Sequence, residues 1–244
     1  MNFTRLIYLL ILFSTLSFSL SFSTAKKKLL KKVYHDHKIT FYCKNPYEIK
    51  RVKNKEKALI ISDHSKYTAR NEFTKKGKVN IRAKRVEWEH IIPAENFGRQ
   101  LSCWRNGDDK CITKKGKRYK GRRCCRKVSP IFKEMEADMF NLVPAIGEIN
   151  ADRRNYRYMD TNDELQGQYG ECSFKVDFKA RKAYPPNHTK GFIARTYLYF
   201  SNKYKMRLSK RDKKMFKAWD KKYPPTTWEE LRSERINNIL HNEK

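Results

Sequence analysis

The sequence has few acidic residues, few glycines and few prolines, and it contains no internal repeat. Its 26 Asp and Glu residues stand against 56 Lys and Arg residues, so the net charge is +30 over 244 residues. Nine glycines and eight prolines exclude collagen-like and proline-rich low-complexity chains. Disorder of the low-hydrophobicity type is not expected for most of the length, because 14 Tyr, 14 Phe and 4 Trp residues can build a core. The positive charge predicts a polyanionic partner, which is a nucleic acid, an anionic membrane surface or an acidic glycan.

Long apolar runs are confined to the N-terminus, from Leu6 to Phe22. The small residues that follow, up to Ala25, suit a signal peptidase, so residues 1–25 are predicted to be a secretory signal peptide. A single membrane anchor is the alternative, since the apolar stretch approaches spanning length. Residues 26–39 are predicted to be a basic leader, either a short helix through Leu29 and Val33 or a frayed segment. Residues 40–244 are expected to form one domain.

Export would place the six cysteines in an oxidising compartment, where an even number predicts three disulfides. Zinc is the competing interpretation, but no spacing is Cys-x-x-Cys. Cys103 and Cys111 flank a turn-rich segment and are the natural local pair. Adjacent Cys124 and Cys125 would form a strained ring if joined, so they are expected to pair with the two remaining residues, Cys43 and Cys172.

Apolar periodicity predicts a mixed α+β fold whose helices gather toward the C-terminus. A strand is predicted over Arg85–Ile92, ending at or just beyond His90 before Pro93. Lys110–Lys127 contains ten basic residues and no acidic one, and it is predicted to be a loop. The remaining expected elements are a helix from Ile131 to Pro144, a strand over Cys172–Phe178, a helix from Gly191 to about Tyr204, and two helices with Ser209 and Thr227 as N-terminal caps.

Chemistry-bearing residues concentrate at the end of the predicted strand and in the segment before Pro144. Glu89 and His90 are neighbours, so they can serve one site only if the backbone turns after them. Asn141 follows Asp138 by three residues and would share its helical face. Oxygen ligands from Glu89 and Asn141 would suit Mg²⁺ or Ca²⁺. A neutral His90 beside such an ion could accept a proton from an attacking water.

Each of these residues also has an ordinary structural interpretation. Glu89 could be an ion-pair partner, His90 a structural imidazole and Asn141 a helix cap. His90 is nevertheless the histidine flanked by a carboxylate inside an apolar element, whereas the others lie in basic, terminal or loop-like surroundings. Elimination therefore favours His90.

Several motifs follow one another along the chain: Glu87-Trp88-Glu89-His90-Ile91-Ile92-Pro93-Ala94, Phe97-Gly98-Arg99-Gln100, Cys103-Trp104, Met135-Glu136-Ala137-Asp138, Asn141-Leu142-Val143-Pro144-Ala145-Ile146-Gly147-Glu148-Ile149-Asn150, Asp152-Arg153, Gln168-Tyr169-Gly170 and Ile193-Ala194-Arg195-Thr196-Tyr197. In order and spacing these motifs resemble the bacterial endonuclease I family of periplasmic and secreted nucleases, and the resemblance runs from about Thr40 to Ile236.

The resemblance implies a ββα-metal nuclease core within residues 40–244, in which a strand pair and a helix present the catalytic groups around one divalent ion. It implies that Glu89 and Asn141 hold Mg²⁺, with Ca²⁺ or Mn²⁺ as alternatives, and that His90 is the general base. The implied substrate is DNA, with RNA as a further one, cleaved without sequence preference to leave 5′-phosphate ends. The charge agrees, because phosphate contacts from Lys and Arg dominate nonspecific binding.

The sequence departs from the family in two places. Phe140 stands where family members usually have His. An arginine that members place between the two local cysteines, where it contacts phosphate, has no clear counterpart here. Arg105 or Lys110 is expected to substitute, and Arg153 is a further candidate phosphate anchor unless it pairs with Asp152.

The sequence thus predicts a monomeric, metal-dependent, sequence-nonspecific endonuclease that is periplasmic or secreted and not inserted in a membrane after signal cleavage. One rival is a noncatalytic nucleic-acid-binding protein, which would bind without cutting. The other is a cationic protein that binds the envelope or a membrane, for which Ser209–Lys222 is the one candidate amphipathic helix.

Overall fold

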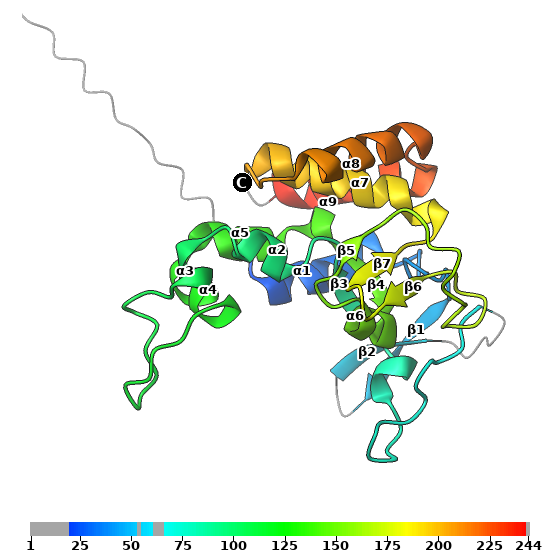
Figure 1. Cartoon of the computed structure of the whole chain (residues 1–244), viewed down its shortest axis with the longest axis horizontal. Helices are drawn as coiled ribbons and strands as arrows, with labels where there is room; N and C mark the ends of the chain where they lie inside the picture. The colour runs from blue at the N-terminus through cyan, green and yellow to red at the C-terminus, as the bar shows by residue number, and fades with distance from the viewer. Residues whose placement is uncertain (1–19, 53–54, 61–65, 243–244) are drawn as a thin grey trace, which may run out of the picture.

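The computed structural model describes residues 20–52, 55–60 and 66–242 (Figure 1). Most of the predicted signal peptide, residues 1–19, lies outside these ranges. Helices and small sheets are mixed, as the sequence predicts, and helices α7, α8 and α9 lie together on one side of the strands. None of the helices within the described ranges is both long enough and apolar enough to cross a membrane.

The N-terminal segment is helical and packed. Helix α1 (Phe22–Lys28) begins after Ser21, whose hydroxyl accepts a hydrogen bond from the amide of Thr24, and a π-helical turn η1 (Leu29–Val33) continues it. Leu29 and Val33 are fully buried in a hydrophobic cluster with residues of helix α9 (Thr227–His241). Of the two alternatives for this segment, the helix is therefore the one observed.

Strands β3 (Val86–His90) and β4 (Leu142–Ile146) form an antiparallel pair at the centre of the molecule, with His90 opposite Leu142. Strand β3 ends where the sequence predicts. Short helix α6 (Gly147–Arg153) follows β4 directly.

The helix predicted to run to Pro144 is wrong in its second half. Helix α5 (Pro130–Ala137) ends before Asp138, whose backbone is extended and whose side chain caps a 3-10 turn, η3 (Met139–Asn141). The chain then becomes β4, which accommodates Pro144 because the sheet has only two strands and the missing N–H faces away from the partner. Asp138 and Asn141 consequently do not share a helical face.

The other described strands form two further small sheets. Strands β1 (Tyr47–Val52) and β2 (Lys55–Ile60) form an antiparallel pair. Strand β7 (Lys182–Tyr184) lies between β5 (Arg157–Tyr158) and β6 (Lys175–Asp177). The strand predicted over Cys172–Phe178 is thus present but shorter, because Cys172 is held in a turn by its disulfide and by a bridge to Tyr169.

The C-terminal helices agree with their predicted caps to within a few residues. Helix α7 (Asn187–Lys203) starts one turn earlier than predicted. Helix α8 (Lys210–Lys222) is capped by Ser209, whose hydroxyl accepts from the amide of Asp212. Helix α9 is capped by Thr226, one residue before the predicted cap.

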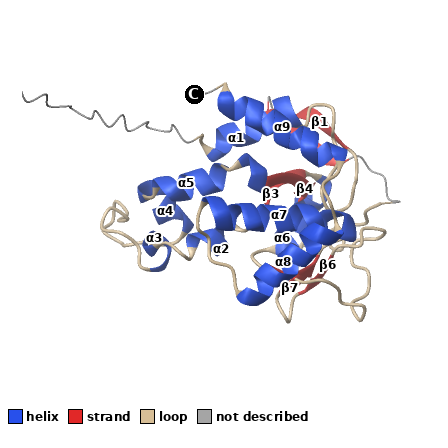
Figure 2. Cartoon of the chain, turned by 90° about the horizontal axis from the view of Figure 1, so that it is seen from above, coloured by secondary structure: helices blue, strands red, loops and turns tan. Residues whose placement is uncertain are grey.

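All three disulfides form, but the predicted pairing is wrong. Cys103 bonds to Cys125, Cys111 to Cys124 and Cys43 to Cys172. The reason is that the basic segment predicted as a loop ends in helix α4 (Arg122–Val128), which begins after Gly121 in the left-handed region at φ 76°. That helix presents its adjacent cysteines to two different partners, on the chain around helix α3 (Ser102–Arg105). Helices α3, α4 and α5 form one end of the molecule in Figure 2, close to helix α2 (Ala94–Gly98).

Candidate active site

The end of strand β3 brings together the residues that the sequence singles out. Glu89 lies opposite Val143 and His90 opposite Leu142, so Asn141 stands one residue beyond the pair. The amide of Ile92 donates to Oδ1 of Asn141 at 2.7 Å, and Nδ2 of Asn141 donates to the carbonyl of Ile92 at 3.1 Å. Asn141 therefore ties the chain leaving β3 to the start of β4, and it holds the turn that the sequence requires after His90.

Glu89 and His90 both face a cavity of about 370 Å³. The cavity is lined by residues from β3, α2, α3, α4 and α6 and from the adjoining chain: Glu89, His90, Pro93, Ala94, Glu95, Trp104, Arg122, Asn150, Arg153, Arg154 and Asn155. Asn141 is fully buried and does not line it. The two residues predicted to be catalytic thus line one cavity, whereas the predicted ligand Asn141 does not.

His90 is held as a neutral imidazole. Its Nε2 lies 2.9 Å from the carbonyl oxygen of Glu136, which can only accept, so Nε2 carries the hydrogen and Nδ1 keeps a free lone pair. Burial lowers the pKa of His90 to about 4, against the hydrogen bond to Glu136, which raises it. The ring of Phe22 stacks on the imidazole with 5.0 Å between centroids. His90 can therefore accept a proton at neutral pH.

Glu89 is a carboxylate buried at the cavity wall, with 3% of its surface exposed. Its Oε1 accepts a hydrogen bond from Tyr42 Oη at 3.3 Å and lies 3.3 Å from Nη1 of Arg153. Burial raises the pKa of Glu89 to about 7, although the charge of Arg153 opposes the shift. A bound cation would offset this cost of burying a negative charge.

Arg153 supports the backbone of the site. It is fully buried, and its guanidinium donates to the carbonyls of His90 at 3.1 Å and Ile91 at 2.5 Å. Its possible partner Asp152 is engaged elsewhere, in a bidentate pair with Arg70 at 3.0 Å. The pairing of Arg153 with Asp152 considered from the sequence is therefore wrong, and the ion-pair partner of Arg153 is Glu89.

The other two predicted phosphate contacts lie away from the cavity. Arg105 ends helix α3 and is exposed, and Lys110 is exposed in the basic segment. Neither side chain lines the cavity. Sequence reasoning missed Arg122, which does line it and whose Nε donates to Oε1 of Glu136 at 2.5 Å. The one feature of the sequence that could have pointed to Arg122 is its position just before Cys124 and Cys125, whose disulfides fix helix α4.

Four side chains that line the cavity carry an oxygen donor for a metal ion, Glu89, Glu95, Asn150 and Asn155, whereas the predicted ligand Asn141 is buried and does not line it. Glu89 fits, because it offers a buried anionic oxygen. The Asn141 amide oxygen accepts one hydrogen bond, from Ile92, which leaves one lone pair for a cation. Across residues 20–52, 55–60 and 66–242, no three His, Cys, Asp or Glu side chains are grouped so that they could hold a metal. Water would have to supply the remaining ligands, as is common for Mg²⁺.

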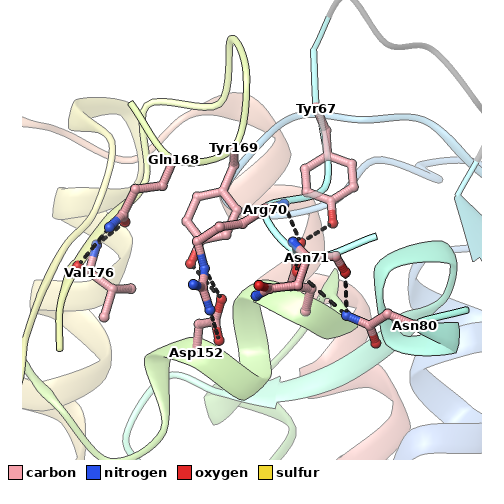
Figure 3. Close-up of polar contacts among 9 residues, drawn as sticks. Tyr67, Arg70, Asn71, Asn80, Asp152, Gln168, Tyr169 and Val176 are labelled. Atoms are coloured by element: carbon pink, nitrogen blue, oxygen red, sulfur yellow. Dashed lines mark hydrogen bonds and ion pairs between the residues drawn. The ribbon is translucent and has the colours of Figure 1, made fainter. Parts of the chain in front are cut away.

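Helix α6 is anchored by a polar network through Glu148 and Asp152. Glu148 is buried and accepts hydrogen bonds from Tyr67 Oη at 2.7 Å and from the amides of Arg70 and Asn71 at 3.0 and 2.7 Å. Figure 3 shows the neighbouring contacts, in which Asp152 accepts from Arg70 and from Tyr169. This network fixes the chain around residues 67–71 against the helix that carries Arg153.

A second cavity, of about 380 Å³, lies between the chain after η1 and helices α7 and α9. Aromatic residues such as Phe41, Phe192 and Trp228 contribute to its lining. It contains neither Glu89 nor His90, so it has no part in the chemistry described above.

The sequence model of the endonuclease I family matches residues 21–244. An extracellular deoxyribonuclease of Aeromonas hydrophila is 41% identical over 221 residues, which cover 89% of this chain and 85% of the relative. A periplasmic deoxyribonuclease of the same organism is 40% identical over 219 residues, covering 89% of this chain and 81% of the relative. Endonuclease-1 of Buchnera aphidicola subsp. Acyrthosiphon pisum (strain APS) is 44% identical over 161 residues, covering 66% of this chain and 58% of the relative.

Proposed function

Since the chain belongs to the endonuclease I family, we propose that it is a secreted or periplasmic endonuclease that hydrolyses the phosphodiester bonds of DNA in a metal-dependent reaction. RNA is a further substrate, sequence specificity is absent, and the products carry 5′-phosphate ends. The protein acts as a monomer. Strands β3 and β4 with helix α6 correspond to the ββα-metal core in this proposal.

The observation that carries the proposal is the state of His90. It lies at the wall of a cavity beside a buried carboxylate, and its Nε2 is committed to the carbonyl of Glu136. The free lone pair of Nδ1 can take a proton from a water molecule that attacks phosphorus. Because burial keeps the pKa of His90 near 4, the imidazole is uncharged at neutral pH and can accept a proton.

Glu89 and Asn141 would hold the metal ion. When bound, a divalent cation neutralises charge on the nonbridging and departing oxygens of the phosphate. Glu89 contributes a negative oxygen at the cavity, and Asn141 orders the turn through Ile92 so that Glu89 and His90 keep their positions. Arg153 holds the carbonyls of His90 and Ile91, which fixes the backbone that carries both groups.

The net charge of +30 supports a polyanionic substrate. Contacts from Lys and Arg to phosphates do not depend on sequence, so a strongly basic surface favours nonspecific binding. The names of the relatives from Aeromonas hydrophila, extracellular and periplasmic deoxyribonuclease, support both the substrate and the location.

The proposal is tested by nicking of a supercoiled plasmid with and without EDTA. The wild-type protein should nick the plasmid in Mg²⁺, and EDTA should stop it. His90→Ala should slow cleavage by at least ~10²-fold, the lower scale for a lost general base, while DNA binding persists. His241→Ala is the matched control, because His241 is exposed near the end of helix α9 and far along the chain from the site.

Binding without nicking by the wild-type protein would favour the noncatalytic rival and reject the proposal. Cleavage by His90→Ala within a few-fold of wild type would reject the role of His90. Cleavage that persists in EDTA would reject the metal dependence.

A further inference from the structure

The cavity beside His90 has three cationic side chains, and they differ in what they can still bind. Arg153 is fully buried, and it already donates to three backbone carbonyls and pairs with Glu89. Arg154 is exposed and has its guanidinium 5.9 Å from the ring of Tyr156. Arg122 is half-buried, with 40% of its side chain exposed. It is therefore accessible from the cavity and also held in place.

Arg122 is held through one nitrogen only. Its Nε donates to Oε1 of Glu136 at 2.5 Å, and within the described part of the chain its two Nη groups donate no hydrogen bond. The guanidinium thus keeps a pair of donors in fork geometry, the arrangement that binds two oxygens of a phosphate.

Glu136 connects Arg122 to His90. Its carboxylate holds Arg122, and its backbone carbonyl accepts from Nε2 of His90. One residue near the end of helix α5 therefore sets the position of both the base and the cation. The ring of Phe22 also lies near both residues: it stacks on the His90 imidazole, and its centre is 5.9 Å from the Arg122 guanidinium carbon.

Helix α4 gives Arg122 a rigid support. Cys124 and Cys125 follow it on the helix and are bonded to Cys111 and Cys103. The chain between α3 and α4 projects from this end of the molecule in Figure 1 and carries exposed lysines, so the phosphates flanking a bound site would also meet positive charge.

We propose that Arg122 is the residue that binds the scissile phosphate, through its two Nη groups, with Glu136 as the residue that positions it. The proposal rests on the proposed nuclease function and deepens it. Arg122 stabilises the negative charge that develops on the nonbridging oxygens as water attacks. Arg105, Lys110 and Arg153 are not required for this contact.

The test compares Arg122→Met and Arg122→Lys with one control, Arg123→Met, and with a second variant of the cavity, Arg154→Met. Arg123→Met is the matched control, because Arg123 neighbours Arg122 on the same helix, carries the same charge and lies over the ring of Tyr119, outside the cavity. Arg154→Met tests the other accessible cation of the cavity. The rate at saturating DNA, the KM and the dependence of binding on salt are measured for each variant.

Arg122→Met should lower kcat by roughly 10²-fold, the scale of one lost donor to a developing anion, and should reduce the salt slope by about one phosphate contact. Arg122→Lys should restore the salt slope but not the rate, because a lysine keeps the charge and loses the fork. A purely structural role for Arg122 would instead lower the amount of active protein and leave kcat per active site and the salt slope unchanged. Arg123→Met should cleave within a few-fold of wild type, and Arg154→Met should lose less rate than Arg122→Met.

The proposal is overturned if Arg122→Lys keeps the parental kcat, or if Arg154→Met loses more rate than Arg122→Met. It is distinguished from failure of the nuclease function by His90→Ala. If His90→Ala and EDTA abolish nicking while Arg122→Met and Arg123→Met cleave equally, the nuclease function stands and the role of Arg122 is wrong. If Arg122→Met does not fold, Arg122→Lys alone decides.

Discussion

We expect that removal of residues 1–25 would destabilise the enzyme and slow its cleavage of DNA, so that a cut after Ala25 is not the one that produces the exported protein. The sequence places the end of a signal peptide at Ala25, but helix α1 begins at Phe22, and Ala25 is fully buried. A cut after Ala25 would divide this helix. It would also remove the ring that stacks on His90. We therefore expect the N-terminus of the exported protein to lie at or before Ser21.

The cost of such a cut follows from three contacts. Loss of the Ser21 cap should cost about 1 kcal/mol. The half-buried ring of Phe22 should contribute about 1 kcal/mol by burial and roughly another 1 kcal/mol by its contact with His90. Together these give about 3 kcal/mol, which is roughly a hundredfold change in the folding equilibrium.

Two measurements check this prediction. Urea unfolding should separate a chain that starts at Leu20 from one that starts at Lys26 by about 3 kcal/mol, and plasmid nicking should be slower for the shorter chain because His90 loses its support. Phe22→Leu in the longer chain is the matched variant, which keeps burial but removes the aromatic ring. Mass spectrometry of the exported protein then locates its N-terminus. An exported chain that begins at Lys26 and matches the longer one in stability and rate would refute the reasoning.

Three further predictions concern the disulfides, the polar network and the metal. Replacing both Cys111 and Cys124 by Ser should lower the free energy of unfolding by roughly 2–4 kcal/mol, and peptide mapping of the intact protein should recover Cys111–Cys124 and Cys103–Cys125 rather than Cys103–Cys111. Glu148→Gln should lower the free energy of unfolding in urea by about 1–3 kcal/mol. The Glu148 oxygens Oε1 and Oε2 each accept a backbone N–H, whereas a Gln side chain has only one accepting oxygen. The control Glu171→Gln should have little effect, because Glu171 is exposed. Glu89→Gln should weaken cleavage at limiting Mg²⁺ and recover in part at high Mg²⁺, since it removes a negative ligand without changing shape; parental rates at limiting Mg²⁺ would show that Glu89 is not a ligand.

Acid should loosen the link between His90 and Arg122. Burial alone would raise the pKa of Glu136, but the hydrogen bond from Arg126 and the charge of Arg122 outweigh it, and the pKa is lowered from 4.5. A lowered carboxyl pKa stabilises the folded state above the unfolded pKa, and this contribution is lost as pH falls through the folded pKa. The support that Glu136 gives to Arg122 is therefore complete at neutral pH and fails only below about pH 4.5.

The sequence predicts the site better than it predicts the chain around it. Strand β3 could be identified because alternation and Pro93 mark its end, and that placed Glu89 and His90 together. Asn141 was singled out as an oxygen donor, but the helix assigned to it ends at Asp138. The apolar spacing before Pro144 suits a helix equally well, and only pairing with β3 makes Leu142–Ile146 a strand.

Contacts between distant segments could not be read from local patterns. The pairing of Cys124 and Cys125 depends on helix α4, and the segment Lys110–Lys127, with its ten scattered basic residues, gives no sign of a helix. The position of Arg122 depends in turn on that pairing and on Glu136. Charge repulsion within this segment opposes the compact form, and the disulfides stabilise it by restricting the unfolded chain.

Two of the disulfides hold helix α4, and through it Arg122, so an oxidising compartment supports one part of the proposed site directly. His90 is positioned by strand β3 and by the carbonyl of Glu136 in helix α5, and neither element contains a cysteine. Arg122 lies on a helix of seven residues in a segment of high positive charge, and both of its neighbouring cysteines are bonded. A short isolated helix is marginal in water, so helix α4 depends on these bonds for its position. In a reducing compartment we therefore expect Arg122 to lose its support before His90 does. If Arg122 binds the scissile phosphate as proposed, reduction of these disulfides should slow cleavage by more than the loss of stability alone would.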